Sequence, residues 1–303
     1  MKICAACSHE QPKDKFSKKQ WQAKQHRRCK ECIADNRAVN AEVEAPNDEP
    51  SRPSESADGK VASRWTDDDL FKQPPSRGDC DICMLPLPHN NTEMAYHACC
   101  GKTLCAGCLH ADRIKNSRTI CAFCRAPPAT SEGEYIRMVE KRVEADDAWA
   151  MCSLGGHFYR GDIGLPQNHK KANKLYLRAG ELGYTEGYYN VGVSYDKGRG
   201  VERDTMKAKH YYSLAAMGGN ESARYNLGYL ENEAGNVDRA TKHWMISAGS
   251  GHDKSLGAVR ECYVQGYATK DDFERALRAH QSSKDEMKSE QREAAAAYFD
   301  QNK

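Results

Sequence analysis

Cysteine spacing constrains this sequence more than any other feature. Of the 14 cysteines, twelve lie within the first 124 residues, and ten of those form C-x-x-C pairs. A tetrahedral zinc site needs four thiolate or imidazole ligands, and one C-x-x-C turn supplies two of them. Disulfides are the rival explanation, but they belong to exported proteins, and Met1-Lys2-Ile3-Cys4 opens no apolar signal segment. The pattern therefore predicts that part of the chain folds around about three zinc ions.

Composition limits what the remainder can be. The formal net charge of +2 argues against a globally basic nucleic-acid coat. The mean hydropathy of −0.85 is low for one compact globule, so we expect some of the 303 residues to be disordered. The longest apolar runs fall well short of the roughly 20 residues that a membrane span requires. We expect a soluble protein of the cytoplasm or nucleus with no membrane partner, and the sequence does not decide between those compartments.

Three related segments follow one another in the second half of the chain. Leu-Gly-like pairs recur at Leu154-Gly155, Val191-Gly192 and Leu227-Gly228, and closing glycines recur at Gly183, Gly219 and Gly251. Basic-Ala pairs recur at Lys171-Ala172, Lys207-Ala208, Arg239-Ala240 and, more loosely, Arg275-Ala276. The first two offsets between these basic-Ala pairs are 36 and 32 residues. Such a period predicts stacked helical hairpins, with small residues where the helices cross.

The repeats resemble a known family. The stretches 195–201 (Tyr-Asp-Lys-Gly-Arg-Gly-Val) and 223–229 (Ala-Arg-Tyr-Asn-Leu-Gly-Tyr) look like the SEL-like repeat, a relative of the tetratricopeptide repeat. The resemblance covers roughly residues 147–280. It implies a right-handed α-solenoid that binds protein partners and performs no catalysis. Cys152 and Cys262 lie in this array, and we interpret both as packed thiols.

The second cysteine cluster lies at residues 80–124. Eight cysteines in four pairs can complete two tetrahedral sites. The opening pair Cys80-Asp81-Ile82-Cys83, the middle stretch from Cys99 to Cys108 and the closing pair Cys121-Ala122-Phe123-Cys124 resemble the all-cysteine variant of the RING finger. In that family, pairs one and three share one zinc, and pairs two and four share the other. The resemblance thus implies Cys80, Cys83, Cys105 and Cys108 for the first zinc, and Cys99, Cys100, Cys121 and Cys124 for the second.

One departure from the RING pattern leaves an alternative open. Most RING fingers carry a histidine ligand where Lys102 stands, and a lysine at neutral pH does not bind zinc. Cys99 is therefore taken as the ligand. His97 is the rival, because His97-x-x-Cys100 also has ligand-like spacing. His110 is interpreted as a solvated surface residue.

The resemblance also implies a function. A RING finger performs no covalent step and instead holds a ubiquitin-charged conjugating enzyme in a reactive orientation. The implied contacts are Ile82, Leu109 and Pro127, with Arg125 at the position that bridges the conjugating enzyme and ubiquitin. Ala122 stands where the family often has proline, which puts engagement of the conjugating enzyme in question.

A smaller cysteine set opens the chain. Two further pairs, Cys4/Cys7 and Cys29/Cys32, can bind one more zinc. They resemble the small LIM-like finger of the Stc type, which implies protein bridging at chromatin. Residues 1–32 carry nine Lys and Arg against three acidic residues, which could favour a nucleic-acid contact, but a solvated basic face is the interpretation that we favour.

The predicted fold is mainly α, an α-solenoid of helical-hairpin repeats with two small zinc-stabilised domains. Its predicted segments are a finger at 1–34, a disordered linker at 35–77, the RING-like domain at 78–128, a connecting helix at 131–146, repeats at 147–280 and a C-terminal helix or tail at 281–303. Ser131 and Glu134 predict a capping box at the start of the connecting helix. Within the linker, Thr66 is expected to cap a helical turn carrying Leu70 and Phe71, either as a partner-docking motif or, as we favour, packed on the RING-like domain.

Two hypotheses remain. The first is a RING-type ubiquitin ligase whose RING binds the conjugating enzyme and whose repeats recruit a protein substrate. The second is a non-catalytic scaffold of zinc fingers and repeats, with chromatin or nucleic acid as a possible partner. Motifs of other enzyme classes, such as a phosphate-binding glycine loop, an H-E-x-x-H helix or a nucleophile elbow, are not present in the sequence.

Overall fold

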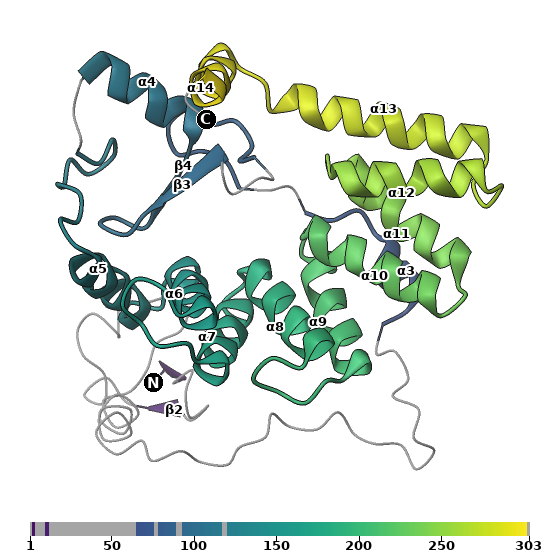
Figure 1. The fold of residues 1–303 in the computed structure, drawn as a ribbon, viewed down its shortest axis with the longest axis horizontal. Helices are drawn as coiled ribbons and strands as arrows, with labels where there is room; N and C mark the ends of the chain where they lie inside the picture. Colours follow the sequence, from purple (N-terminus) through teal and green to yellow (C-terminus); the bar gives the residue numbers. More distant parts are fainter. Residues whose placement is uncertain are drawn as a thin grey trace. The chain divides into compact units, whose positions relative to one another are not determined.

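The computed structural model describes residues 65–75, 78–88, 93–116 and 120–301, together with the backbone of 2–3 and 10–11. The chain divides into two compact units, Met1–Val61 and Ala62–Lys303. In the first unit, β1 (Lys2–Ile3) and β2 (Glu10–Gln11) form an antiparallel pair. The other elements belong to the second unit (Figure 1). The predicted disordered linker lies largely outside the described residues.

A short hairpin and a helix organise residues 78–128, which we call the cysteine-rich unit. Strands β3 (Met94–His97) and β4 (Lys102–Cys105) pair antiparallel, with Met94 opposite Cys105 and His97 opposite Lys102. Helix α4 (Ala106–Asn116) follows β4 directly. The small core of the unit centres on Leu104, which is fully buried beside Cys80, Cys105 and Cys108.

The repeats form four helical hairpins, in which each pair of helices packs together and then against the next pair (Figure 1). The hairpins are α6 (Ala148–Arg160) with α7 (His169–Glu181), α8 (Thr185–Lys197) with α9 (Thr205–Met217), α10 (Glu221–Glu233) with α11 (Val237–Gly249), and α12 (Asp253–Val264) with α13 (Lys270–Glu286). The predicted solenoid is confirmed, although α13 continues past the predicted end at 280.

The recurring glycines do what the repeat pattern predicted. A Cβ added at Gly155 would lie 2.8 Å from the ring of Tyr176, and one at Gly192 would lie 2.6 Å from the ring of Tyr212. In the third hairpin, a Cβ at Gly228 would lie 2.4 Å from Nε1 of Trp244. Each of these three hairpins therefore places an aromatic ring of its second helix directly on the backbone of its first. Only glycine leaves room for this contact.

The closing glycines end the second helices. Gly183, Gly219 and Gly251 have φ of 92°, 96° and 90°, a region that residues with a side chain rarely adopt. The chain turns there into the next repeat. Cys152 and Cys262 are buried in the array, as predicted for packed thiols.

Helix α5 (Glu132–Glu144) connects the cysteine-rich unit to the repeats. Ser131 accepts a hydrogen bond from the backbone of Glu134, as predicted. The reciprocal half of the capping box is wrong, because the Glu134 carboxylate instead accepts bonds from the backbone and hydroxyl of Thr130, both at 2.7 Å. One side-chain cap is enough to satisfy an otherwise unpaired N–H at the helix start.

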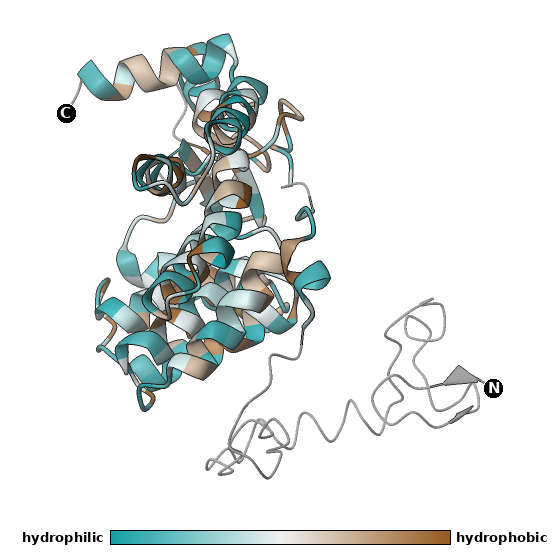
Figure 2. Ribbon diagram, turned by 90° about the vertical axis from the view of Figure 1, so that its right-hand side faces the viewer, coloured by the Kyte–Doolittle hydropathy of each residue, from teal (hydrophilic) through white to brown (hydrophobic). Residues whose placement is uncertain are grey.

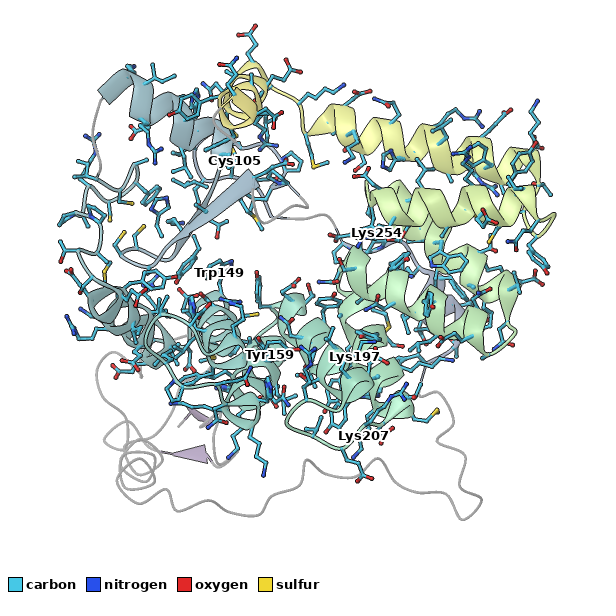
Figure 3. All side chains as sticks on the ribbon, viewed as in Figure 1. Cys105, Trp149, Tyr159, Lys197, Lys207 and Lys254 are labelled. Atoms are coloured by element: carbon cyan, nitrogen blue, oxygen red, sulfur yellow. The ribbon has the colours of Figure 1, made fainter. Side chains whose placement is uncertain are left out.

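Packing continues from the cysteine-rich unit into the repeats. Tyr96 of β3 stacks on Trp149 of α6 with ring centroids 3.8 Å apart, and its hydroxyl donates to the Asp147 carboxylate at 2.7 Å. Trp149 faces β3 in Figure 3. Hydrophobic and hydrophilic residues alternate along the helices of the array (Figure 2), as expected when each helix buries one stripe. Among the described residues, no helix combines the length and apolar character needed to cross a bilayer.

Two further helices lie outside the repeats. Helix α14 (Glu290–Gln301) packs against α4 of the cysteine-rich unit, so the segment predicted as a C-terminal helix or tail is docked. Helix α3 (Asp67–Phe71) begins after Thr66, as expected, but it contacts α9 and α11 of the array. The favoured interpretation, packing on the RING-like domain, is therefore wrong for α3. The buried surface that accepts Leu70 belongs to the repeats.

Candidate metal centre

Two groups of four cysteines converge in the cysteine-rich unit. Cys105 ends β4 (Figure 3) and Cys108 lies in the first turn of α4, while the adjacent Cys99 and Cys100 occupy the turn between β3 and β4. Each of these pairs meets a C-x-x-C turn from elsewhere in the chain. The resulting groups are Cys80, Cys83, Cys105 and Cys108, and Cys99, Cys100, Cys121 and Cys124. This crossed arrangement brings together the same two sets that the resemblance implied.

The sulfur spacing fits a tetrahedral thiolate site. Within each group the sulfur atoms all lie within 4.8 Å of one another. Cys83 and Cys105 are 3.8 Å apart, as are Cys100 and Cys121, while Cys99 and Cys124 are 3.4 Å apart. Zinc–sulfur bonds of about 2.3 Å in a regular tetrahedron put the sulfurs about 3.8 Å apart. A disulfide would need about 2.05 Å. The donor set therefore suits zinc.

Two turns present their sulfurs in the same way. Met84 N donates to Cys80 O at 2.9 Å, and Arg125 N donates to Cys121 O at 3.0 Å. Both Met84 and Arg125, each directly after the second cysteine of its pair, have left-handed backbones with φ of 55° and 65°. The tight turn then aims backbone N–H groups at the first sulfur, with Cys124 N 3.5 Å from Cys121 Sγ.

These N–H groups stabilise the thiolate form. Burial by itself raises the pKa of Cys80, but hydrogen bonds from the backbone of Cys105, Cys83 and Ile82 bring that pKa down to about 7. The pKa of Cys121 is lowered by the same kind of bond. Burial and neighbouring cysteines raise the pKa of Cys99 and Cys108. Four thiolates at this separation repel one another, so a bound cation is what would hold all four ionised.

His97 does not join the second group. Among the described residues, the group whose ligand atoms lie within 4.8 Å of one another consists of the four cysteines alone. The backbone carbonyl of His97 accepts hydrogen bonds from Cys100 N and Gly101 N. Its Nε2 is buried and has no hydrogen-bond partner among the residues that the structure describes, and burial lowers the pKa of the ring. His110, interpreted as a solvated residue, packs against Tyr298 of α14 with ring centroids 4.9 Å apart. That interpretation is wrong because α14 covers this side of α4.

Lys102 has a role that its position in the sequence did not reveal. Its ammonium group donates to the Asp81 carboxylate at 2.8 Å and lies 5.3 Å from the ring centroid of Phe123. Asp81 belongs to the first C-x-x-C turn and Phe123 to the last. Lys102 therefore joins the turns of the two groups at the position where the RING pattern has a ligand.

Three of the four predicted contact residues face solvent. Ile82 is 45% exposed, and Arg125 and Pro127 are also exposed. Leu109 is half-buried, packs on the core of the cysteine-rich unit and lines a hollow of about 210 Å³ together with Phe299 of α14. Phe123 is 47% exposed between Ala122 and Cys124 and was not predicted as a contact. The Asp81–Lys102 ion pair lies beside both apolar side chains, because Ile82 follows Asp81 in the chain and the Lys102 ammonium group lies over the ring of Phe123.

Two residues of α14, Gln291 and Arg292, contact the first group of cysteines and the turn that follows it. The Arg292 guanidinium donates to the carbonyls of Pro86 at 2.8 Å and Leu85 at 3.4 Å, and it lies 3.7 Å from Cys83 Sγ. Gln291 Oε1 lies 3.8 Å from Cys108 Sγ. Gly107 makes this approach possible, because a Cβ there would lie 2.7 Å from Arg292 N. Only Gly107 gave a sequence signal, as a small residue within a cysteine pair.

The predicted ligands Cys4, Cys7, Cys29 and Cys32 lie outside the described residues, and of the Stc-like segment only the backbone of Lys2–Ile3 and Glu10–Gln11 is described.

Comparison with known proteins concerns the repeats. A family model described as "Sel1 repeat" matches residues 150–184 and 185–220. Residues 150–220 are two Sel1 repeats. Each match spans one hairpin, α6–α7 and α8–α9, and the glycine–aromatic contact of Gly228 and Trp244 continues the pattern into the third hairpin. Neither match includes a residue of the cysteine-rich unit.

Curated relatives share this part of the chain. The "ERAD-associated E3 ubiquitin-protein ligase component HRD3B" of Arabidopsis thaliana is 31% identical over 113 residues, which is 37% of this chain and 18% of that protein. The HRD3A component from the same plant is 34% identical over 103 residues, 32% of this chain and 15% of that protein. The chain thus spans less than a fifth of the length of these relatives. Among solved structures, a Sel1 repeat protein from Oxalobacter formigenes aligns with a TM-score of 0.45 and 24% identity, covering 51% of this chain and 64% of that one.

Proposed function

We propose that this chain is a RING-type ubiquitin ligase, in which the cysteine-rich unit binds a ubiquitin-charged conjugating enzyme and the Sel1 repeats bind the protein substrate. One observation carries the proposal. The two four-cysteine groups bring together the first turn, the hairpin and the last turn, and Ile82, Phe123 and Arg125 are exposed on turns that Lys102 joins. A rigid surface of this kind suits binding a partner in one orientation.

In this proposal, zinc fixes the shape of the surface and takes no part in bond making. Ile82 and Phe123 supply apolar contact area to the conjugating enzyme. Arg125 directly follows Cys124, has a left-handed backbone and is exposed to solvent. A planar guanidinium can donate to carbonyls of two partners at once, which suits a bridge between conjugating enzyme and ubiquitin. The rate gain would come from holding the thioester in a reactive orientation.

Two relatives support the ubiquitin connection. Both Arabidopsis proteins that match the repeats are named as components of E3 ubiquitin-protein ligases. In this chain, repeats and cysteine-rich unit are packed together through Tyr96 and Trp149. A substrate bound to the repeats would therefore be held close to the surface that binds the conjugating enzyme.

A non-catalytic adaptor is the second candidate. Ala122, where RING fingers often have proline, favours it. The family match also covers the repeats alone.

Autoubiquitination with a panel of conjugating enzymes separates the two candidates. We expect activity for the intact chain and a loss of about tenfold or more for Ile82→Ala or Arg125→Ala, because each removes a contact made at the reactive complex. Val264→Ala is the matched control, since Val264 is 70% exposed in the repeats, and it should retain full activity. Inactivity of the zinc-loaded chain with every conjugating enzyme would favour the adaptor.

A further inference from the structure

The segment from Trp65 to Pro75 lies on the repeats in the manner of a bound peptide. Helix α3 belongs to no hairpin, yet it contacts α9 and α11. Its conformation is set locally. Thr66 accepts a hydrogen bond from Asp69 N, and the Asp69 carboxylate accepts one from Thr66 N at 3.0 Å, which completes a capping box. A five-residue helix preorganised in this way loses little entropy on docking.

The apolar end of this segment is anchored. Leu70 is only 4% exposed. The ring of Phe71 lies 4.7 Å from that of His243, and the cationic groups of Arg239 and Lys242 lie 5.3 and 5.6 Å from its centroid. Leu70 is thus buried and Phe71 lies among His243, Arg239 and Lys242, so the two side chains occupy a seat with a cationic rim.

Arg224 makes the seat specific for a peptide backbone. It is 2% exposed, and its guanidinium donates to the carbonyl of Leu70 at 2.6 Å and to that of Ala216 at 2.8 Å. Burial lowers the pKa of Arg224 to about 10. A buried guanidinium that loses a hydrogen-bond acceptor is costly. The repeats therefore present a donor that needs a carbonyl from whatever occupies the seat.

Charge is complementary along the rest of the segment. Asp67, Asp68 and Asp69 form an acidic turn, and Asp67 pairs with Arg239. Arg239 also contacts Glu231, which is 1% exposed and bonded to Lys209 at 2.7 Å. Buried Glu231 fixes Arg239 in place, so the basic rim is held ready for an acidic ligand.

We propose that the face formed by α9, α10 and α11 is a peptide-binding surface for a protein partner that carries acidic residues followed directly by a Leu-Phe pair, and that residues 65–75 occupy it in cis. The inference deepens the proposed role of the repeats in binding protein and does not require ubiquitin transfer. A tethered segment competes at an effective concentration in the millimolar range. A protein partner with micromolar affinity for this surface would therefore have to displace residues 65–75 before it could bind.

The test is direct binding of a labelled peptide of residues 62–75 to full-length protein. In Leu70→Ser/Phe71→Ser, the cis segment loses both anchors and the seat is free. We expect this variant to bind the peptide with micromolar Kd, and the intact chain to bind it up to about a thousandfold more weakly, the ratio of a millimolar effective concentration to a micromolar Kd. Thermal unfolding of the variant verifies that it is folded.

A charge swap supplies the control. Arg239→Glu, added to the Leu70→Ser/Phe71→Ser variant, should weaken binding of the natural peptide about tenfold, and a peptide carrying Asp67→Arg should restore it. Equal affinity of the intact chain and the Leu70→Ser/Phe71→Ser variant would overturn the proposal, as would a folded variant that binds no peptide. Peptide binding without ubiquitination would sink only the ligase proposal, and ubiquitination without peptide binding only this one.

Discussion

Single glycines determine how closely the helices of this array approach. The rings of Tyr176, Tyr212 and Trp244 each lie on a glycine of the preceding helix. In the third hairpin, Trp244 Nε1 also donates to the carbonyl of Tyr225 at 3.1 Å. A methyl group at Gly228 would therefore displace the largest side chain of that hairpin and strain its hydrogen bond.

We expect Gly228→Ala to lower the free energy of unfolding by about 1–3 kcal/mol through overpacking. Gly257→Ala is the matched control. Gly257 lies in α12, is exposed and has no atom within 4 Å of an added Cβ, so alanine there should stabilise the helix by about 0.5–1 kcal/mol. Chemical denaturation measures both. Equal shifts of the two midpoints would contradict the packing argument.

His243 should make stability depend on pH. Burial, followed by the positive charge of Arg224, lowers the pKa of His243 to about 3, while an unfolded histidine titrates near 6.5. Arg239 and Lys209 act in the same direction and Glu231 opposes them. Between pH 6.5 and about 3 the unfolded state binds the extra proton, so stability falls as pH falls, by up to about 1.4 kcal/mol per pH unit.

In His243→Gln this contribution disappears. The variant should be less stable than the natural chain at pH 7.5, and its stability should fall less steeply between pH 6.5 and 5, above the range in which carboxylates protonate. Urea denaturation at each pH gives the two slopes. Parallel slopes would show that His243 is protonated in the folded protein.

At the scale of elements, α14 packs against the cysteine-rich unit although it follows the repeats in the sequence. Arg292 bonds the carbonyls of Leu85 and Pro86, which directly follow the first metal turn, and burial of the guanidinium is offset by the neighbouring sulfurs, which raise the pKa of Arg292. Residues that support metal ligands from behind commonly contribute tenfold or more to metal affinity.

We therefore expect Arg292→Met to release one zinc ion at least about tenfold faster to a competing chelator, with the other zinc unaffected. Arg278→Met is the control, because Arg278 is an exposed residue of α13 that pairs with Glu274. Release of zinc is followed with a metallochromic dye. An unchanged release rate would mean that α14 only covers α4.

Sequence reasoning succeeded where the signal is local or periodic. The resemblance to the RING finger implied the two groups of cysteines that converge in the structure, and the repeated glycines located the hairpins. It failed for contacts that carry neither kind of signal. Arg292 reaches Cys83 from 209 residues away, and α3 docks beside Arg224 at a separation of 154 residues. A solvated basic residue and a buried one look alike in a sequence, so Arg224 gave no warning of its role.

At the scale of the whole molecule, two kinds of core coexist. The repeats bury their own aromatic and small side chains, whereas the cysteine-rich unit has a core of Leu104 and cysteines. So small an apolar core cannot stabilise a domain without additional cross-links. The two regions should therefore respond differently to removal of metal.

We expect elemental analysis to find two zinc ions for the two described groups, and a third if the N-terminal cysteines also bind. Thorough chelation should abolish hydrogen-exchange protection across residues 78–128, while helices α7 to α12 keep theirs. Exchange mass spectrometry resolves both regions. Retained protection at 78–128 after complete zinc removal would refute the metal-dependent fold.

The contact between α14 and α4 has a consequence for how such a chain can evolve. An open solenoid can gain or lose a hairpin at little expense, because each unit touches only its neighbours. Here α14, which follows the repeats, must pack on α4, which precedes them in the chain. A duplicated hairpin would move Arg292 away from the carbonyls of Leu85 and Pro86. The contact between α14 and α4 therefore limits the number of hairpins that can lie between them.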